Sequence, residues 1–124
     1  MTTLKVLFVD DEADICEVVT LALELDPEIE IRCESSGPAG LATATLWRPD
    51  AILLDVMMPL MDGPTTLAHL RANPITRGIP VVFITARAQS REIEKLIGQG
   101  AQAVITKPFD PMTLAAELRM RIGS

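Results

Sequence analysis

Five polar residues that could take part in metal or phosphoryl chemistry stand at the ends of short apolar stretches in this sequence. They are Asp10, Asp11, Asp55, Thr85 and Lys107. A single carboxylate in such a place is unremarkable, and Asp10 with Asp11 could equally cap a following helix and favour its dipole. Three carboxylates, a hydroxyl and an amine in equivalent places are much harder to attribute to chance.

The chemistry open to these groups follows from their charges. Carboxylates that converge on one crevice repel one another at neutral pH and therefore require a cation. Hard oxygen ligands favour Mg²⁺ over zinc, and Mg²⁺ commonly bridges to phosphate oxygens. One carboxylate could then act as a nucleophile and form an aspartyl phosphate. The Lys107 amine and the Thr85 hydroxyl would stabilise the phosphoryl oxygens.

The rest of the sequence predicts the elements that bring these residues together. Strands are predicted over residues 4–9, 29–34, 51–54, 81–84 and 103–105, and helices over 13–25, 37–47, 64–72, 90–98 and from 111 onward. The alternating pattern of residues 29–34 indicates an edge strand. Strands that alternate with helices form a parallel sheet covered on both faces, and ligands bind beyond the carboxyl ends of its strands.

Helical spacing and capping residues also predict which side chains point inward. Ser36 and Asp110 are the expected N-caps, the latter followed by Pro111 at the first helical position. The predicted inward-facing residues are Ile15, Val18, Val19, Ala22 and Leu25 in the first helix, Ile93, Leu96 and Ile97 in the fourth, and Leu114, Ala115 and Leu118 in the last.

Length and composition favour one soluble domain spanning residues 1–124, because 48% of the residues are hydrophobic. A net charge of −6 and an aromatic content of 3% disfavour direct binding to nucleic acid or to anionic membranes. No signal-peptide or membrane-spanning pattern is present in the sequence. Cys16 and Cys33 form no metal-type pair and are expected to be small buried or half-buried thiols. These features together predict a cytoplasmic protein.

Five segments resemble the receiver domains of two-component response regulators, in particular those of the chemotaxis-regulator type. They are residues 9–12 (VDDE), 49–55 (PDAILLD), 58–63 (MPLMDG), 84–86 (ITA) and 106–109 (TKPF). The segments occur in order and at family spacing over nearly the whole chain. Each is weak alone, but the set is specific.

The resemblance implies a doubly wound, flavodoxin-like α/β fold with strand order 2-1-3-4-5 and five helices. It implies that Asp55 accepts a phosphoryl group from a histidine kinase or phosphotransfer protein, and that the domain signals to a downstream effector protein or domain. The Mg²⁺ ligands would be Asp11, Asp55 and the Met57 backbone carbonyl, with Asp10 acting closely or through water. Thr85 and Lys107 would hold the phosphoryl oxygens. Such a protein is a switch rather than an enzyme acting on other substrates.

The resemblance also implies a cis bond between Lys107 and Pro108, and it has one notable departure. The family often places Tyr or Phe three residues before the lysine, where this chain has Val104. Coupling from Thr85 to the face formed by the helix over 90–98, the last strand and the last helix is therefore expected to be weaker or differently built. Met57 and Arg87 occupy positions that tune phosphoryl lifetime in the family.

Two other functions remain open at the level of sequence. A Mg²⁺-dependent phosphatase with an aspartate nucleophile needs a second acid two residues after that nucleophile, where this chain has Met57. An interaction module with an unused pocket is the other alternative, and the intact set of five polar residues argues against it. A phosphorylation assay discriminates between the switch and the unused pocket.

Overall fold

A five-stranded parallel sheet forms the centre of the molecule. The computed structural model describes residues 3–87 and 89–123. Its strands are β1 (Leu4–Val9), β2 (Ile29–Glu34), β3 (Ala51–Asp55), β4 (Val81–Thr85) and β5 (Ala103–Thr106). They lie in the order β2-β1-β3-β4-β5, and every neighbouring pair is parallel. The predicted strand order and the predicted edge position of residues 29–34 are both confirmed.

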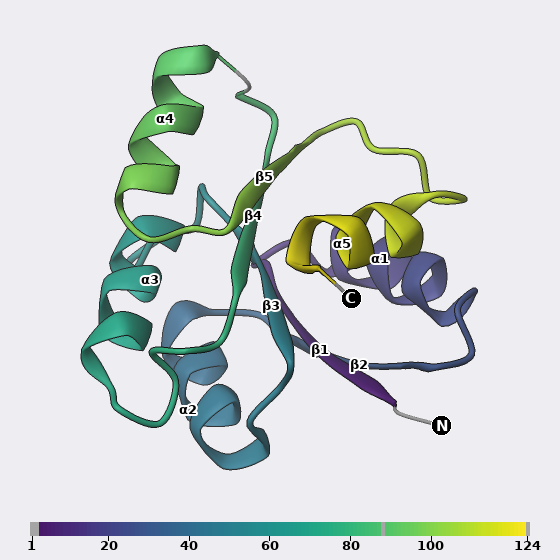
Figure 1. Ribbon diagram of the computed structural model, residues 1–124, viewed down its shortest axis with the longest axis horizontal. Coiled ribbons are helices and arrows are strands. Elements are labelled where there is room, and N and C mark those ends of the chain that lie inside the picture. The colour runs from purple at the N-terminus through teal and green to yellow at the C-terminus, as the bar shows by residue number, and fades with distance from the viewer. Residues whose placement is uncertain (1–2, 88, 124) are drawn as a thin grey trace.

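Helices cover both faces of this sheet. Within the described residues they are α1 (Ala13–Glu24), α2 (Gly37–Trp47), α3 (Gly63–Ala72), α4 (Ser90–Gly98) and α5 (Leu114–Ile122). Figure 1 shows α1 and α5 against one face and α2, α3 and α4 against the other. Strand, helix and strand therefore alternate along the whole chain, as predicted, and the fold is the doubly wound α/β type.

The alternating side chains of the strands divide the core into two layers. In β1, Val6 and Phe8 join the cluster beneath α1 and α5, whereas Leu7 and Val9 join the cluster on the opposite face. All four are buried, as is every residue of β3 and β4. A strand covered on both faces is mostly apolar, which explains why these segments are continuous hydrophobic stretches up to Asp55 and Thr85 at the carboxyl ends of β3 and β4.

Some predicted helix faces were wrong. In α1, Val19 and Ala22 are buried as predicted, but Val18 is 42% exposed and Leu25 is 58% exposed. Leu23 is completely buried instead. The helix ends at Glu24, so that Leu25 falls outside it, and the buried line runs through positions 19, 22 and 23. In α4, Leu96 is buried as predicted, whereas the predicted inward residue Ile97 is 42% exposed.

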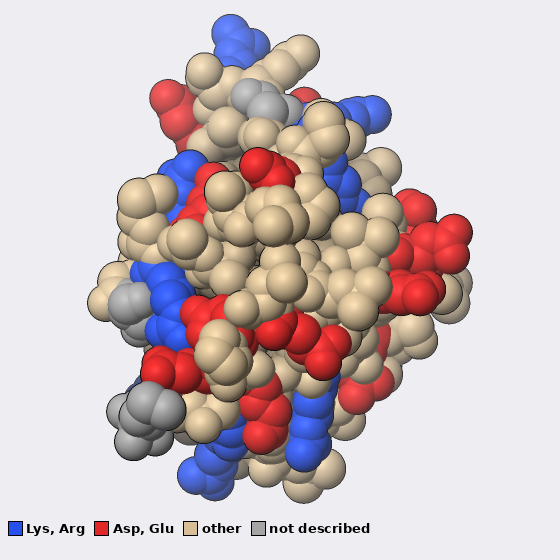
Figure 2. All heavy atoms as spheres, turned by 90° about the vertical axis from the view of Figure 1, so that its right-hand side faces the viewer, with Lys and Arg blue, Asp and Glu red and all other residues tan. Residues whose placement is uncertain are grey.

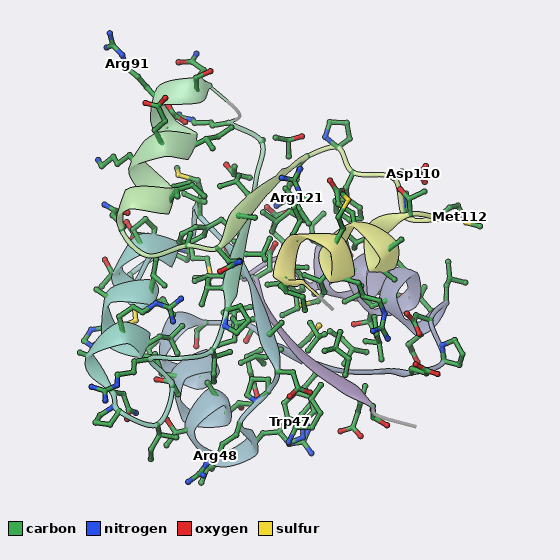
Figure 3. The ribbon with its side chains drawn as sticks, in the orientation of Figure 1. Trp47, Arg48, Arg91, Asp110, Met112 and Arg121 are labelled. Carbon is green, nitrogen blue, oxygen red and sulfur yellow. The ribbon has the colours of Figure 1, made fainter. Side chains whose placement is uncertain are left out.

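The last helix begins later than predicted. Asp110 does not cap it: its side chain accepts a hydrogen bond from the Met112 backbone N–H at 2.9 Å and so closes a turn before α5 begins at Leu114. Figure 3 shows Asp110 and Met112 on this preceding segment. The cap predicted at Ser36 is confirmed, because its hydroxyl accepts from the backbone N–H of Ala39 at 3.2 Å. The bond from Lys107 to Pro108 is cis, as the resemblance implied.

Candidate functional site

Asp10 lies at the carboxyl end of β1 and is fully buried. Its backbone N–H donates to the Glu34 carbonyl at 3.1 Å, which extends the ladder between β1 and β2 by one residue. Its side chain accepts a hydrogen bond from the Glu12 N–H at 2.9 Å. The carboxylate is thus fixed at the sheet edge, while the next residue, Asp11, is exposed.

Asp55 is the last residue of β3, on the strand next to β1, and it is only 4% exposed. One carboxylate oxygen from each of Asp10, Asp11 and Asp55 lies within 4.8 Å of the other two. The convergence predicted from the strand ends is therefore present in the structure. It arises because β1 and β3 are parallel neighbours and their carboxyl ends meet at one edge.

Lys107 brings a positive charge to these carboxylates. Its ammonium nitrogen lies 3.3 Å from Asp55 Oδ1 and 3.5 Å from Asp10 Oδ2. The backbone N–H of Lys107 donates to the Thr85 carbonyl at 2.8 Å, which fixes the segment after β5 beside the end of β4. Lys107 is half-buried, so its charge is only partly screened by water.

Burial and like charge make Asp55 a poor place for a negative charge. Desolvation, followed by repulsion from Asp10, raises the pKa of the Asp55 carboxyl to about 6, although Lys107 pulls it the other way. Burial alone would lower the pKa of Lys107, but the carboxylates of Asp55 and Asp10 outweigh that effect and raise it. Lys107 therefore stays protonated and remains a cation beside the carboxylates.

Thr85 is the last residue of β4, the strand next to β3, and is 3% exposed. Its hydroxyl accepts a hydrogen bond from the backbone N–H of Arg87 at 3.0 Å. The hydroxyl is thus engaged by its own loop. Met57 follows Asp55 by two residues and is 63% exposed. Its role as a carbonyl ligand stays a prediction.

A close approach behind Asp55 is a feature that the sequence analysis did not foresee. A Cβ atom added at Gly63 would lie 2.3 Å from the Asp55 carbonyl oxygen and 2.9 Å from the Cα of Val56. The Gly63 N–H donates to the Val56 carbonyl at 2.9 Å. Only glycine fits here, so the first residue of α3 fixes the backbone that carries Asp55.

The donor set fits a divalent magnesium ion. Three carboxylates carry three negative charges, and Lys107 balances one of them, which leaves two uncompensated charges in a partly buried pocket. Hard oxygen donors suit Mg²⁺, which keeps several waters and so tolerates an exposed ligand such as Asp11.

The protein-family model described as the response regulator receiver domain matches residues 6–119 of this chain. The chain belongs to this family. Receiver domains of two-component response regulators are phosphoacceptor signalling switches, and that is the function of this domain. Among residues 3–87 and 89–123, no helix is long and apolar enough to cross a bilayer.

Similar proteins include both longer regulators and single receiver domains. This receiver domain is 37% identical over 115 residues to the phosphate regulon transcriptional regulatory protein PhoB of Escherichia coli, covering 93% of this chain and 50% of PhoB. It is 43% identical over 117 residues to the response regulator PleD of Caulobacter vibrioides, covering 93% of this chain and 25% of PleD. The chain thus spans about half of one relative and a quarter of the other.

The structure of the chemotaxis response regulator CheY4 of Vibrio cholerae is also similar. It has a TM-score of 0.89 and 31% identity, with 97% of this chain and 99% of that chain covered. This similarity supports the resemblance that the motifs indicated and the flavodoxin-like fold class.

Proposed function

We propose that Asp55 is the phosphoacceptor and that Asp10, Asp11 and Asp55, with the Met57 carbonyl, hold Mg²⁺ beside it. The observation that carries this proposal is the burial of Asp55 within reach of Lys107 and two further carboxylates. A carboxylate whose pKa is about 6 is more basic than an ordinary aspartate but still ionised at neutral pH. It therefore remains available as a nucleophile.

The donor is a phosphohistidine of a histidine kinase or phosphotransfer protein. An Asp55 oxygen forms a bond to phosphorus while the bond from phosphorus to the imidazole nitrogen breaks, and that nitrogen keeps the electron pair. The Lys107 ammonium contacts one phosphoryl oxygen and offsets its negative charge. Mg²⁺ held by Asp10, Asp11, Asp55 and the Met57 carbonyl would supply further positive charge there. The Thr85 hydroxyl leaves Arg87 and donates to the phosphoryl group.

An apolar groove beside Lys107 supports docking of that donor. The groove has a volume of about 390 Å³ and is lined by Ile15, Val18, Ala86, Lys107, Pro108, Phe109 and Pro111. Figure 2 faces the α1 and α5 side of the molecule and shows an uncharged area with acidic and basic side chains around it. A partner that covers this area would bring its histidine to the open side of the pocket.

The signal passes from the phosphorylated pocket to the effector through a change in the position of α4. Within α4, all of whose residues are described, only Leu96 is buried, and a cavity of about 330 Å³ lies between this helix, Thr85 and the start of α3. Movement of Thr85 therefore reaches a helix with few anchors and free space beneath it. Arg91, Lys95 and Gln99 are exposed and offer polar contacts to an effector protein or domain, with Arg91 at the outer end of α4 (Figure 3).

Phosphorylation and mass mapping test the proposal. The protein is incubated with acetyl phosphate and Mg²⁺ in the presence and absence of EDTA, and the modified peptide is identified. We expect the added mass on Asp55, its loss with EDTA and its absence in Asp55→Asn. Label on a different residue refutes the assignment, and no label on intact protein indicates an unused pocket. Amide chemical shifts on adding beryllofluoride test the proposed output, which is refuted if the shifts change only at the pocket and those of residues 87–106 stay the same.

A further inference from the structure

The two cysteines lie together in the fold although they are separated by 17 positions in the sequence. Cys16 is in α1 and Cys33 is in β2, the edge strand next to β1. The Cys33 sulfur lies 3.7 Å from the Cys16 carbonyl oxygen and 3.2 Å from the Thr20 hydroxyl. The two cysteines are therefore neighbours across a helix and a strand.

This dithiol adjoins the acidic pocket. The Cys16 thiol donates to the backbone carbonyl of Asp10 at 3.7 Å, and Asp10 carries one of the three clustered carboxylates. Both cysteines are half-buried at the margin of the core beneath α1 and α5. Packing alone would account for a single small thiol in such a place. Two partly exposed cysteines on adjacent elements, with the sulfur of one against the backbone of the other, are also placed to react with each other.

We propose that Cys16 and Cys33 are an oxidisable dithiol that closes to an intramolecular disulfide and thereby weakens Mg²⁺ binding at the adjoining pocket. The oxidant is a hydroperoxide. It oxidises one thiol to a sulfenic acid and is itself reduced to water or an alcohol. The second thiol attacks the sulfenic sulfur, so that a sulfur–sulfur bond forms, the sulfur–oxygen bond breaks and water leaves. Each disulfide consumes one hydroperoxide.

The effect on the pocket follows from the hydrogen bond that oxidation removes. A Cys16 sulfur in a disulfide has no proton to donate to the Asp10 carbonyl. The segment that carries Asp10 and Asp11 then loses one restraint and is less well organised for metal binding. Because a thiol is a weak donor, the expected change is about two- to threefold in the Mg²⁺ dissociation constant.

Peptide mapping tests the dithiol directly. The reduced chain is treated with hydrogen peroxide, free thiols are blocked, and the products are mapped without reduction. We expect the loss of two hydrogen atoms per chain and a cross-linked pair of peptides holding Cys16 and Cys33, reversed by a reductant. Both thiols remaining free while methionines oxidise, or disulfides forming only between chains, overturns the proposal.

The second measurement is the Mg²⁺ dependence of the melting temperature in reduced and oxidised protein. The double variant Cys16→Ser, Cys33→Ser receives the same peroxide treatment and controls for methionine oxidation. We expect weaker Mg²⁺ binding only in the oxidised wild type. Equal affinity in the oxidised and reduced wild type overturns the coupling of the dithiol to the pocket. The single variant Cys33→Ser should form no intramolecular disulfide.

Discussion

Asp55→Asn should stabilise the metal-free protein at neutral pH, although it removes the proposed phosphoacceptor. The pKa of Asp55 rises from 3.8 to about 6 on folding, because burial and Asp10 disfavour the carboxylate. The difference of about 2.2 pKa units, at 1.36 kcal/mol per unit, corresponds to about 3 kcal/mol against the folded state. The attraction of Lys107 lowers the pKa of Asp55 and is already included in the net value of about 6, so it needs no separate correction. Asparagine carries no charge and avoids this cost.

The gain in stability of Asp55→Asn over the wild type must depend on pH in a defined direction. Because its folded pKa is the higher one, Asp55 binds its proton more tightly in the folded state, and stability falls as pH rises from about 4 to about 6. The cost is fully present above about pH 6 and absent well below pH 4. The advantage of Asp55→Asn should therefore be close to its maximum at pH 7.5 and should fall toward zero on acidification to about pH 4.

Chemical denaturation in EDTA at several pH values measures this difference. A gain of about 3 kcal/mol corresponds to a rise of roughly 10 °C in the melting temperature of a chain of this size. Asp14→Asn is the matched control, since Asp14 is exposed in the first turn of α1. It should change stability by less than about 0.5 kcal/mol, in the destabilising direction. No gain for Asp55→Asn at pH 7.5, or a gain that is the same at pH 4, would refute the electrostatic reasoning.

Three further changes test other parts of the site. Millimolar Mg²⁺ should raise the melting temperature of the wild type. When the Mg²⁺ concentration is 100 times the dissociation constant, the added stability is about 2.7 kcal/mol. Asp11→Ala should lose this response in a thermal melt. Lys107→Gln should cost about 2 kcal/mol or more at pH 7.5 in urea unfolding, because Asp10 and Asp55 lose their cation; equal stability would contradict the charge balance. Gly63→Ala should lower stability by about 2 kcal/mol or more and should slow phosphorylation. Gly78→Ala is the control, because a Cβ at that position meets open space, and it should change neither stability nor the phosphorylation rate.

The sequence was sufficient to predict the convergence of the acidic residues because that convergence depends on topology alone. Once β1 and β3 are parallel neighbours, Asp10 and Asp55 must reach the same edge, whatever the packing of the helices. The helix faces were less predictable. Whether Leu23 or Leu25 packs inward depends on where α1 ends and how it turns over the sheet, and apolar residues on both sides of the helix satisfy the same periodicity.

Features that depend on contacts between distant segments were beyond sequence reasoning. The need for glycine at position 63 arises from the backbone of Asp55, eight residues earlier in the chain and on another element. The contact of Cys16 with Cys33 likewise requires α1 to lie over β2. Asp110 has the right residue type for a helix cap, but its side chain closes the preceding turn instead. Local preference cannot distinguish these two uses of the same carboxylate.

The energetics of the proposed switch can be argued from the bond that Thr85 makes in the structure. In the proposed switch, the Thr85 hydroxyl turns toward a phosphoryl group at Asp55 and gives up the Arg87 N–H, a neutral hydrogen bond of about 1 kcal/mol. A hydrogen bond to a charged phosphoryl oxygen contributes about 1.5–3 kcal/mol, so the exchange favours the phosphorylated arrangement by a small margin. Val104 should add little steric resistance to this movement of Thr85, since a buried valine side chain is smaller than an aromatic ring. A margin of this size produces a population shift rather than a complete conversion, because about 1.4 kcal/mol changes a two-state ratio only tenfold. An effector that prefers the shifted α4 would therefore complete the transition by binding.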